Sequence, residues 1–227
     1  MTRISKYKHA LTLVELHKIL FFCLKKMKKI KTPLTKFLIL RNMTMFFLIY
    51  FIGLRPKECT NIKLDDLDLT NKTLYIPAQN NKQRQSDLMP IPEFIYFKLM
   101  EYLHQRNIFY GNSIWAFPSS RGGNSLDRSQ FVKIFRNALR DAGLYKVSYK
   151  DKKGLNRGEI TLYSLRRGFG TLVYSKTKDI KKTATLLRHK DQQFRSTMLY
   201  IYTTQDRTKK NLMEEVYNET PVFEEEP

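Results

Sequence analysis

The stretch that decides the fold lies at residues 161–171 and reads Thr-Leu-Tyr-Ser-Leu-Arg-Arg-Gly-Phe-Gly-Thr. It opens a helical segment that we predict to run from Leu162 to about Leu187, because apolar residues recur along it at helical spacing. Arg166 lies inside this segment, and its planar guanidinium carries a fork of donors that stays charged at any working pH. The stretch therefore predicts a helix that holds a permanent cation.

A second stretch, at residues 53–58, reads Gly-Leu-Arg-Pro-Lys-Glu. It follows a long apolar-periodic segment, residues 35–52, which the glycine is well suited to end. The proline fits the first position of a new helix, so Arg55 lies beside a positive helix end where an anion is stabilised. The alternative is that Arg55 is an exposed cation that pairs with Asp65 or Asp66.

The charge of the chain indicates a polyanionic partner. The 227 residues include 41 Lys and Arg against 21 Asp and Glu, a formal net charge of +20. The positive charge is spread through the chain, so DNA, RNA and anionic membranes are candidates. The length suits one domain with a sizeable core and is too short for two full-sized domains.

The cysteines and the apolar run at residues 43–54 give further expectations. Cys23 and Cys59 lack metal-ligand spacing with any histidine and cannot make a disulfide framework, which suits a reducing cytosol. The apolar run is well below the roughly 20 residues needed to cross a bilayer. We therefore expect a buried core helix there, and no membrane partner.

The remaining periodicity predicts a mainly α-helical fold with a small antiparallel β-sheet. A capping box formed by Thr12 and Glu15 begins the first helix. The other expected elements are a β-hairpin with a long basic tip formed by residues 73–76 and 88–91, helices at 93–106 and 127–142, a surface loop or hairpin at 146–159, and a last short helix from about 196.

Both arginine stretches resemble the boxes of the tyrosine recombinases, the phage-integrase family. In the first box a glycine, a leucine and an arginine are followed three places later by an acid; in the second, an arginine precedes a small-aromatic-small-threonine pattern. From residue 11 to about 204 the chain follows the family's order, including an aromatic-proline segment at 115–118. The resemblance implies the catalytic domain and the DNA breaking-rejoining fold, in an Xer-like or short fimbrial-switch form.

The resemblance implies roles for three residues at a scissile phosphate. Cutting DNA without a metal needs a nucleophile, cations that neutralise the phosphate oxygens, and an acid for the leaving oxygen. Arg55 and Arg166 match the two arginines that clamp the phosphate. Tyr163 stands at the histidine position of the second box, where its hydroxyl can donate to a phosphate oxygen but a phenol is a poor general base.

The histidine and the nucleophile are expected further along the chain. His189 ends a Leu-Leu-Arg-His turn that resembles the family's leucine, glycine, histidine turn, and is expected to be a second phosphate donor. Arg188 replaces the usual glycine. Tyr200, after a threonine and two further residues as in the fimbrial-switch recombinases, is the expected nucleophile. Tyr202 is the alternative, because it also fits the family's tyrosine-threonine ending.

Two further residues complete the expected site. Lys82 lies in the hairpin tip, where the family carries the lysine that protonates the leaving 5′-oxygen. With Lys72 and Arg84 close by in sequence, its alternative role is that of a solvated cation. Glu58 is expected either to orient an active-site cation or to be an ordinary helix acid.

The resemblance implies a site-specific recombinase that works through a 3′-phosphotyrosine link, for integration, excision, inversion or resolution. No metal or nucleotide cofactor is expected, and because that link conserves bond energy, strand exchange can proceed without ATP. The expected partner is double-stranded DNA. The chain is expected to form a homo-tetramer on two DNA sites and to be a monomer or weak oligomer without DNA. A bacterial cytoplasm or nucleoid is the expected location. The rival functions are a catalytically inactive DNA-binding relic or regulator with the same fold, and a general basic coating protein for nucleic acid.

The expected domain limits are a short N-terminal extension at residues 1–10, the catalytic domain at 11–210, and a tail at 211–227. The tail either docks on a neighbouring protomer or is disordered. Only about ten residues precede the first expected helix, with no room for the clamp domain that usually comes first. The chain is therefore expected to be either a naturally short recombinase or a fragment of a longer one.

Overall fold

The computed structural model describes residues 9–80, 85–121, 123–151, 154–189 and 197, and within them confirms a mainly α-helical fold with small antiparallel sheets. The helices are α1 (Leu13–Lys29), α2 (Pro33–Phe51), α3 (Pro56–Thr60), α4 (Glu93–Tyr110), α5 (Arg128–Asp141), α6 (Leu162–Thr177) and α7 (Ile180–Leu186), with a 3-10 turn at Leu64–Asp66. The strands are β1 (Leu67–Asp68), β2 (Thr73–Ile76), β3 (Asp87–Pro90), β4 (Val147–Lys150) and β5 (Asn156–Gly158).

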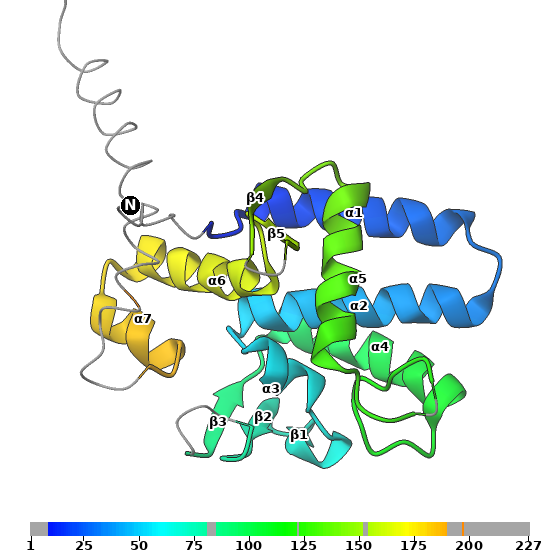
Figure 1. Ribbon diagram of the computed structural model, residues 1–227. Coiled ribbons are helices and arrows are strands. Elements are labelled where there is room, and N and C mark those ends of the chain that lie inside the picture. The colour runs from blue at the N-terminus through cyan, green and yellow to red at the C-terminus, as the bar shows by residue number, and fades with distance from the viewer. Residues whose placement is uncertain (1–8, 81–84, 122, 152–153, 190–196, 198–227) are drawn as a thin grey trace, which may run out of the picture.

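Helix α2 is the centre of the molecule. It contacts α1, α3, α4 and α6, while α5 crosses in front of it in Figure 1. Aromatic stacking attaches α4 and α5 to α2. The ring centroid of Phe37 lies 5.6 Å from that of Tyr102 on α4, and the centroid of Phe46 lies 5.9 Å from that of Phe131 on α5. By length and composition α2 could cross a membrane. The apolar helix is therefore longer than the apolar run at residues 43–54 that the sequence suggested. Its burial by these neighbours makes it the core helix that we expected.

The start of α1 is fixed by the predicted capping box and by a contact with α6. The hydroxyl of Thr12 accepts from the backbone N–H of Glu15 at 3.2 Å, and the carboxylate of Glu15 accepts from the backbone N–H of Thr12 at 2.8 Å. One residue earlier, the N–H of Leu11 donates to the carbonyl of Ser164 at 2.9 Å. The beginning of α1 is therefore attached to the first turn of α6.

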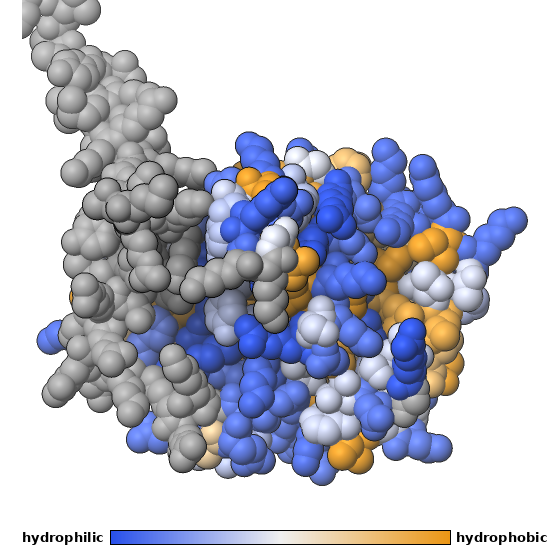
Figure 2. Space-filling model, in the orientation of Figure 1, coloured by the Kyte–Doolittle hydropathy of each residue, from blue (hydrophilic) through white to orange (hydrophobic). Residues whose placement is uncertain are grey.

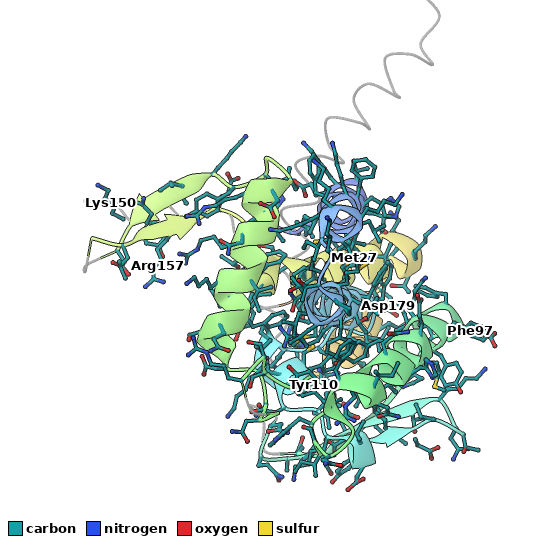
Figure 3. The ribbon with its side chains drawn as sticks, turned by 90° about the vertical axis from the view of Figure 1, so that its right-hand side faces the viewer. Met27, Phe97, Tyr110, Lys150, Arg157 and Asp179 are labelled. Atoms are coloured by element: carbon teal, nitrogen blue, oxygen red, sulfur yellow. The ribbon has the colours of Figure 1, made fainter. Side chains whose placement is uncertain are left out.

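The predicted hairpin is confirmed as the larger sheet. Its strands are antiparallel in the order β1-β2-β3, and its register pairs Thr73 with Pro90 and Ile76 with Asp87. Alternation places Leu74, Ile76 and Met89 against the core. The second predicted hairpin, β4-β5, carries Lys150 and Arg157 and projects beyond α5 in Figure 3.

The helical region predicted from Leu162 to about Leu187 consists of two helices. Helix α6 ends at Thr177, and Lys178 takes a left-handed conformation with φ of 52°. Asp179 then caps α7, because its carboxylate accepts from the backbone N–H of Lys181 at 2.7 Å and of Lys182 at 3.1 Å. The apolar period continues across the break, which is why periodicity alone did not reveal it.

Gly53 joins α2 to the residues of the site. Its φ of +72° lies in the left-handed region, and an added Cβ would overlap the ring of Phe169 on α6. Only glycine meets both constraints without strain. The close approach of these two elements therefore depends on this residue.

We expect Gly53→Ala to lower the free energy of unfolding by about 2–4 kcal/mol, from left-handed strain plus overpacking. Gly143→Ala is the matched control, since Gly143 has a φ of +65° and open space around it, and should cost only about 1 kcal/mol. Urea unfolding of both variants measures the difference. Equal losses for the two variants would show that the contact with Phe169 adds nothing.

Candidate active site

Arg55 lies at the start of α3, as the sequence predicted. Its backbone N–H donates to the Oε2 of Glu58 at 2.6 Å, and its Nη1 donates to the Oε1 of the same carboxylate at 2.6 Å. Its side chain is 14% exposed and therefore keeps some contact with the surface. The structure therefore gives Arg55 a different partner from the Asp65 or Asp66 that we considered.

Glu58 is buried, with its side chain 1% exposed. Besides Arg55, its carboxylate contacts Arg188, whose Nη2 donates to Oε2 at 2.5 Å, and lies 4.0 Å from the Nη1 of Arg166. A buried carboxylate is tolerated when it is paired and hydrogen-bonded. Glu58 thus lies among three guanidiniums, which an ordinary exposed helix acid does not.

Arg166 projects from α6 toward the same place. It is 2% exposed, and it donates to the carbonyl of Gly53 through Nη1 and to the carbonyl of Leu187 through Nη2. The neighbouring Arg167 donates instead to the carbonyl of His9 at 2.9 Å. Of the two adjacent arginines, the one chosen from the sequence is therefore the one that faces Glu58.

The turn after α7 brings His189 beside these arginines. The N–H of Arg188 donates to the carbonyl of Thr185 at 2.8 Å, and the N–H of His189 donates to that of Ala184 at 2.9 Å. This pattern closes a helix with one left-handed residue, here Arg188 with φ of 52°. The family's glycine suits that position because it has no Cβ. In this chain an arginine occupies that left-handed position.

His189 is partly buried and bound to Thr197. Its Nδ1 lies 2.7 Å from the Oγ1 of Thr197, a fully buried residue. Burial, together with the positive charges of Arg166, Arg55 and Arg188, lowers the pKa of His189 to about 4. The imidazole is therefore neutral at neutral pH.

Tyr163 lies in the first turn of α6 and is 38% exposed. The guanidinium carbon of Arg128 lies 5.9 Å from the centroid of its ring, which places a cation from α5 over the aromatic face.

Lys82, Tyr200 and Tyr202 lie outside the described residues, so their placement stays a prediction. The described residues on either side of the Lys82 segment contact site elements. Asn80 accepts from the Nδ2 of Asn61 at 3.1 Å, and the Oδ2 of Asp87 lies 3.8 Å from the Nε of Arg188. Thr197, three residues before Tyr200, is likewise attached to His189.

Sequence reasoning missed the parts played by Arg188 and Thr197. Arg188 was noted only as a departure from glycine, yet its side chain contacts Glu58 in the centre of the cluster. A left-handed position occupied by a long cation was the signal that it had a partner. Within the described residues no group of three or more His, Cys, Asp or Glu is placed to hold a metal ion.

The described residues that Figure 2 shows form a mostly hydrophilic face. Figure 2, in the orientation of Figure 1, shows hydrophilic side chains over α3, α5 and the larger sheet, while apolar atoms gather near the turn that joins α1 to α2. With a net charge of +20, this composition suits a polyanionic partner over a membrane.

Comparison with known proteins identifies the family. Residues 15–208 match the profile of the phage integrase family, and the chain therefore belongs to it. This span contains both arginine stretches, the histidine turn and both candidate tyrosines.

The curated relatives include Xer recombinases. The chain is 27% identical over 172 residues to the tyrosine recombinase XerC of Halalkalibacterium halodurans, covering 75% of this chain and 52% of the relative. It is 29% identical over 192 residues to the tyrosine recombinase XerD of Rickettsia conorii, covering 79% and 57%. The chain spans about half the length of the curated relatives it matches.

Solved structures share the fold. XerA recombinase superposes with a TM-score of 0.65 at 20% identity, covering 88% of this chain and 60% of XerA. XerH bound to a palindromic difH substrate, in a post-cleavage complex, superposes with a TM-score of 0.66 at 22% identity, covering 93% and 55%. These likenesses confirm the predicted catalytic-domain fold.

The lowered pKa of His189 predicts a loss of stability in acid. Because the folded value of about 4 lies below the ordinary value, the unfolded chain takes up a proton first as pH falls from about 6.5 to about 4. The stabilisation by neutral His189 is therefore complete above about pH 6.5 and is lost toward pH 4. We expect His189→Gln to lose less stability across this window than wild type in urea unfolding.

The matched control is His17→Gln, at an exposed position of α1, which should follow the wild-type dependence. If His189→Gln and wild type lose stability in parallel, the pKa of His189 is not lowered in the folded protein.

Proposed function

We propose that the chain is the catalytic domain of a site-specific DNA recombinase that cleaves and rejoins strands through a 3′-phosphotyrosine intermediate. One observation carries the proposal: Arg55, Arg166 and Arg188, from three distant stretches, surround the buried carboxylate of Glu58, and His189 is close enough to the same three arginines to feel their charge. A buried acid that holds guanidiniums in place is a preorganised site for a phosphate whose charge grows in the transition state. Membership of the phage integrase family supports the same chemistry.

Arg55 and Arg166 would bind the non-bridging oxygens of the scissile phosphate. Arg166 is anchored by two backbone carbonyls and Arg55 by Glu58, so each guanidinium is oriented before DNA arrives. This removes the cost of ordering them in the transition state. Neutral His189, with Nδ1 on Thr197, would donate from Nε2 to the same phosphate.

In the proposed step the hydroxyl oxygen of Tyr200 attacks phosphorus in line, with Tyr202 as the alternative nucleophile. The bond from phosphorus to the 5′-oxygen breaks, and Lys82 supplies the proton that the leaving oxygen takes. We assign the proton of the attacking tyrosine to solvent water, because Tyr163 is a phenol and a poor base. The hydroxyl of Tyr163 would instead donate to a phosphate oxygen.

The proposed partners follow from the charge and the family. Double-stranded DNA is the substrate, in keeping with the net charge of +20 and with neighbours such as XerH solved on difH DNA. We propose a homo-tetramer on two DNA sites, a cytoplasmic location, and a catalytic domain at residues 11–210 whose tail, 211–227, docks on a neighbouring protomer. No metal or nucleotide is assigned a role.

The test is covalent capture on suicide duplexes, nicked beside the scissile phosphate so that the short cleaved strand diffuses away. Binding sites would first be selected from a random duplex pool with the full chain. We expect wild type to form an adduct that survives denaturing electrophoresis, and Tyr200→Phe to form none. An adduct lost only in Tyr202→Phe would move the nucleophile, and tight binding without an adduct would favour the inactive relic.

Arg166→Lys separates phosphate binding from general positive charge. A lysine keeps the charge but lacks the fork that spans the carbonyls of Gly53 and Leu187. We expect single-turnover cleavage to fall by about 100- to 1,000-fold, as for loss of one transition-state donor, with little change in DNA affinity. Arg167→Lys, one residue along the same helix, is the control; equal losses in both variants would contradict the assignment.

A further inference from the structure

Arg188 occupies a position for which it is poorly suited by conformation. Its φ of 52° lies in the left-handed region, where a residue with a Cβ costs free energy that glycine avoids. Its side chain is nevertheless buried, at 3% exposure, so a long charged chain is held in the interior. Both costs need compensation from specific contacts.

The contacts of Arg188 reach three parts of the chain. Its Nη2 donates to the Oε2 of Glu58 at 2.5 Å and lies 3.4 Å from the carbonyl of Gly53. Its Nε lies 3.8 Å from the Oδ2 of Asp87, the first residue of β3. Its own carbonyl accepts from the Nη2 of Arg55 at 3.1 Å.

These contacts fix the orientation of Glu58. Oε2 is held by Arg188 and by the backbone N–H of Arg55, which leaves Oε1 directed at the Nη1 of Arg55 at 2.6 Å. The guanidinium of Arg55 is therefore held at Nη1 by Glu58 and at Nη2 by the carbonyl of Arg188. Arg188 thus constrains Arg55 at two points without lying at the surface itself.

Asp87 extends the same network into the larger sheet. It pairs with Ile76 at the end of the ladder where the loop joins β2 to β3, and its 3.8 Å ion pair with Arg188 joins β3 to the histidine turn. With Asp87 included, three guanidiniums face two carboxylates, which leaves a positive excess at the proposed phosphate site.

We propose that Arg188 is a positioning residue that ties the β2-β3 hairpin and the histidine turn to Glu58, and so sets the position of Arg55. The inference rests on the proposed function and adds to it a residue at which this chain departs from the family's glycine. Arg188 acts through Glu58, Arg55 and Asp87, the residues that its contacts reach.

The test compares Arg188→Gly, Arg188→Lys, Asp87→Asn and the double variant Arg188→Gly/Asp87→Asn. Lys178→Gly is the matched control, because Lys178 has the same φ of 52° at the exposed end of α6. Two readouts are taken on the full chain. One is single-turnover cleavage of the selected suicide duplexes, and the other is hydrogen exchange of the β3 amides in the absence of DNA.

We expect Arg188→Gly to slow cleavage by about 10- to 100-fold at unchanged DNA affinity, the effect of a small misplacement of a catalytic group. Arg188→Lys should lie in between, because one ammonium group cannot span both carboxylates. Exchange should quicken at Leu88 and Met89 in Arg188→Gly and in Asp87→Asn. The double variant should be no slower in cleavage than Arg188→Gly, since both changes break one link. Lys178→Gly should match wild type in both readouts.

Arg188→Gly that matches Lys178→Gly in cleavage and exchange would reduce Arg188 to a turn residue and overturn the proposal. If Arg188→Gly does not fold, Asp87→Asn decides, and wild-type behaviour of that variant in both readouts is the contrary result. Absence of an adduct with wild type would count against the recombinase function alone. The β3 exchange rates would still show whether Arg188 holds the hairpin.

Discussion

The site depends on the ion pairs and hydrogen bonds of the buried Glu58 carboxylate. An acid at 1% side-chain exposure would be strongly destabilising alone, and the structure satisfies it with Arg55, Arg188 and the backbone of α3. The guanidiniums depend on Glu58 in turn, because burying each of them without the acid would also cost free energy. Loss of one partner therefore disturbs the remaining members, and the cluster behaves as a unit.

Backbone geometry places the members of that unit. Gly53 turns the chain at the end of α2 and presents its carbonyl to Arg166, while the left-handed turn after α7 presents the carbonyl of Leu187 to the same guanidinium. Two helix ends thus act as acceptors for one arginine of a third helix. The apolar packing of α2 against its neighbours fixes the distance between those ends, so the core determines the electrostatics of the site.

How much of the site could be predicted differs from residue to residue. The choice of Arg55, Arg166, His189 and Glu58 as candidates follows from short boxes whose order is shared with a family, and the structure places Arg55 and Arg166 at Glu58 and His189 near both arginines. The break between α6 and α7 was missed, because Lys178 is an unusual left-handed residue and the apolar period runs across it. The sequence showed Arg188 only as a departure from the family's glycine. Its contacts could not be predicted, because its partners Glu58 and Asp87 are 130 and 101 positions away in the sequence.

The sequence by itself determined the helices, the hairpin and the cationic character, because capping boxes, apolar periods and net charge act over short range or over the whole composition. Through the family's box it also indicated which arginine of the pair at 166 and 167 faces Glu58. Only the tertiary structure decided which side chains surround Glu58 and that Arg188 is held by this carboxylate. It also decided that the Nδ1 of His189 contacts the hydroxyl of Thr197. Those contacts join residues far apart in the chain, and burial, which gives them their strength, exists only once the helices have packed.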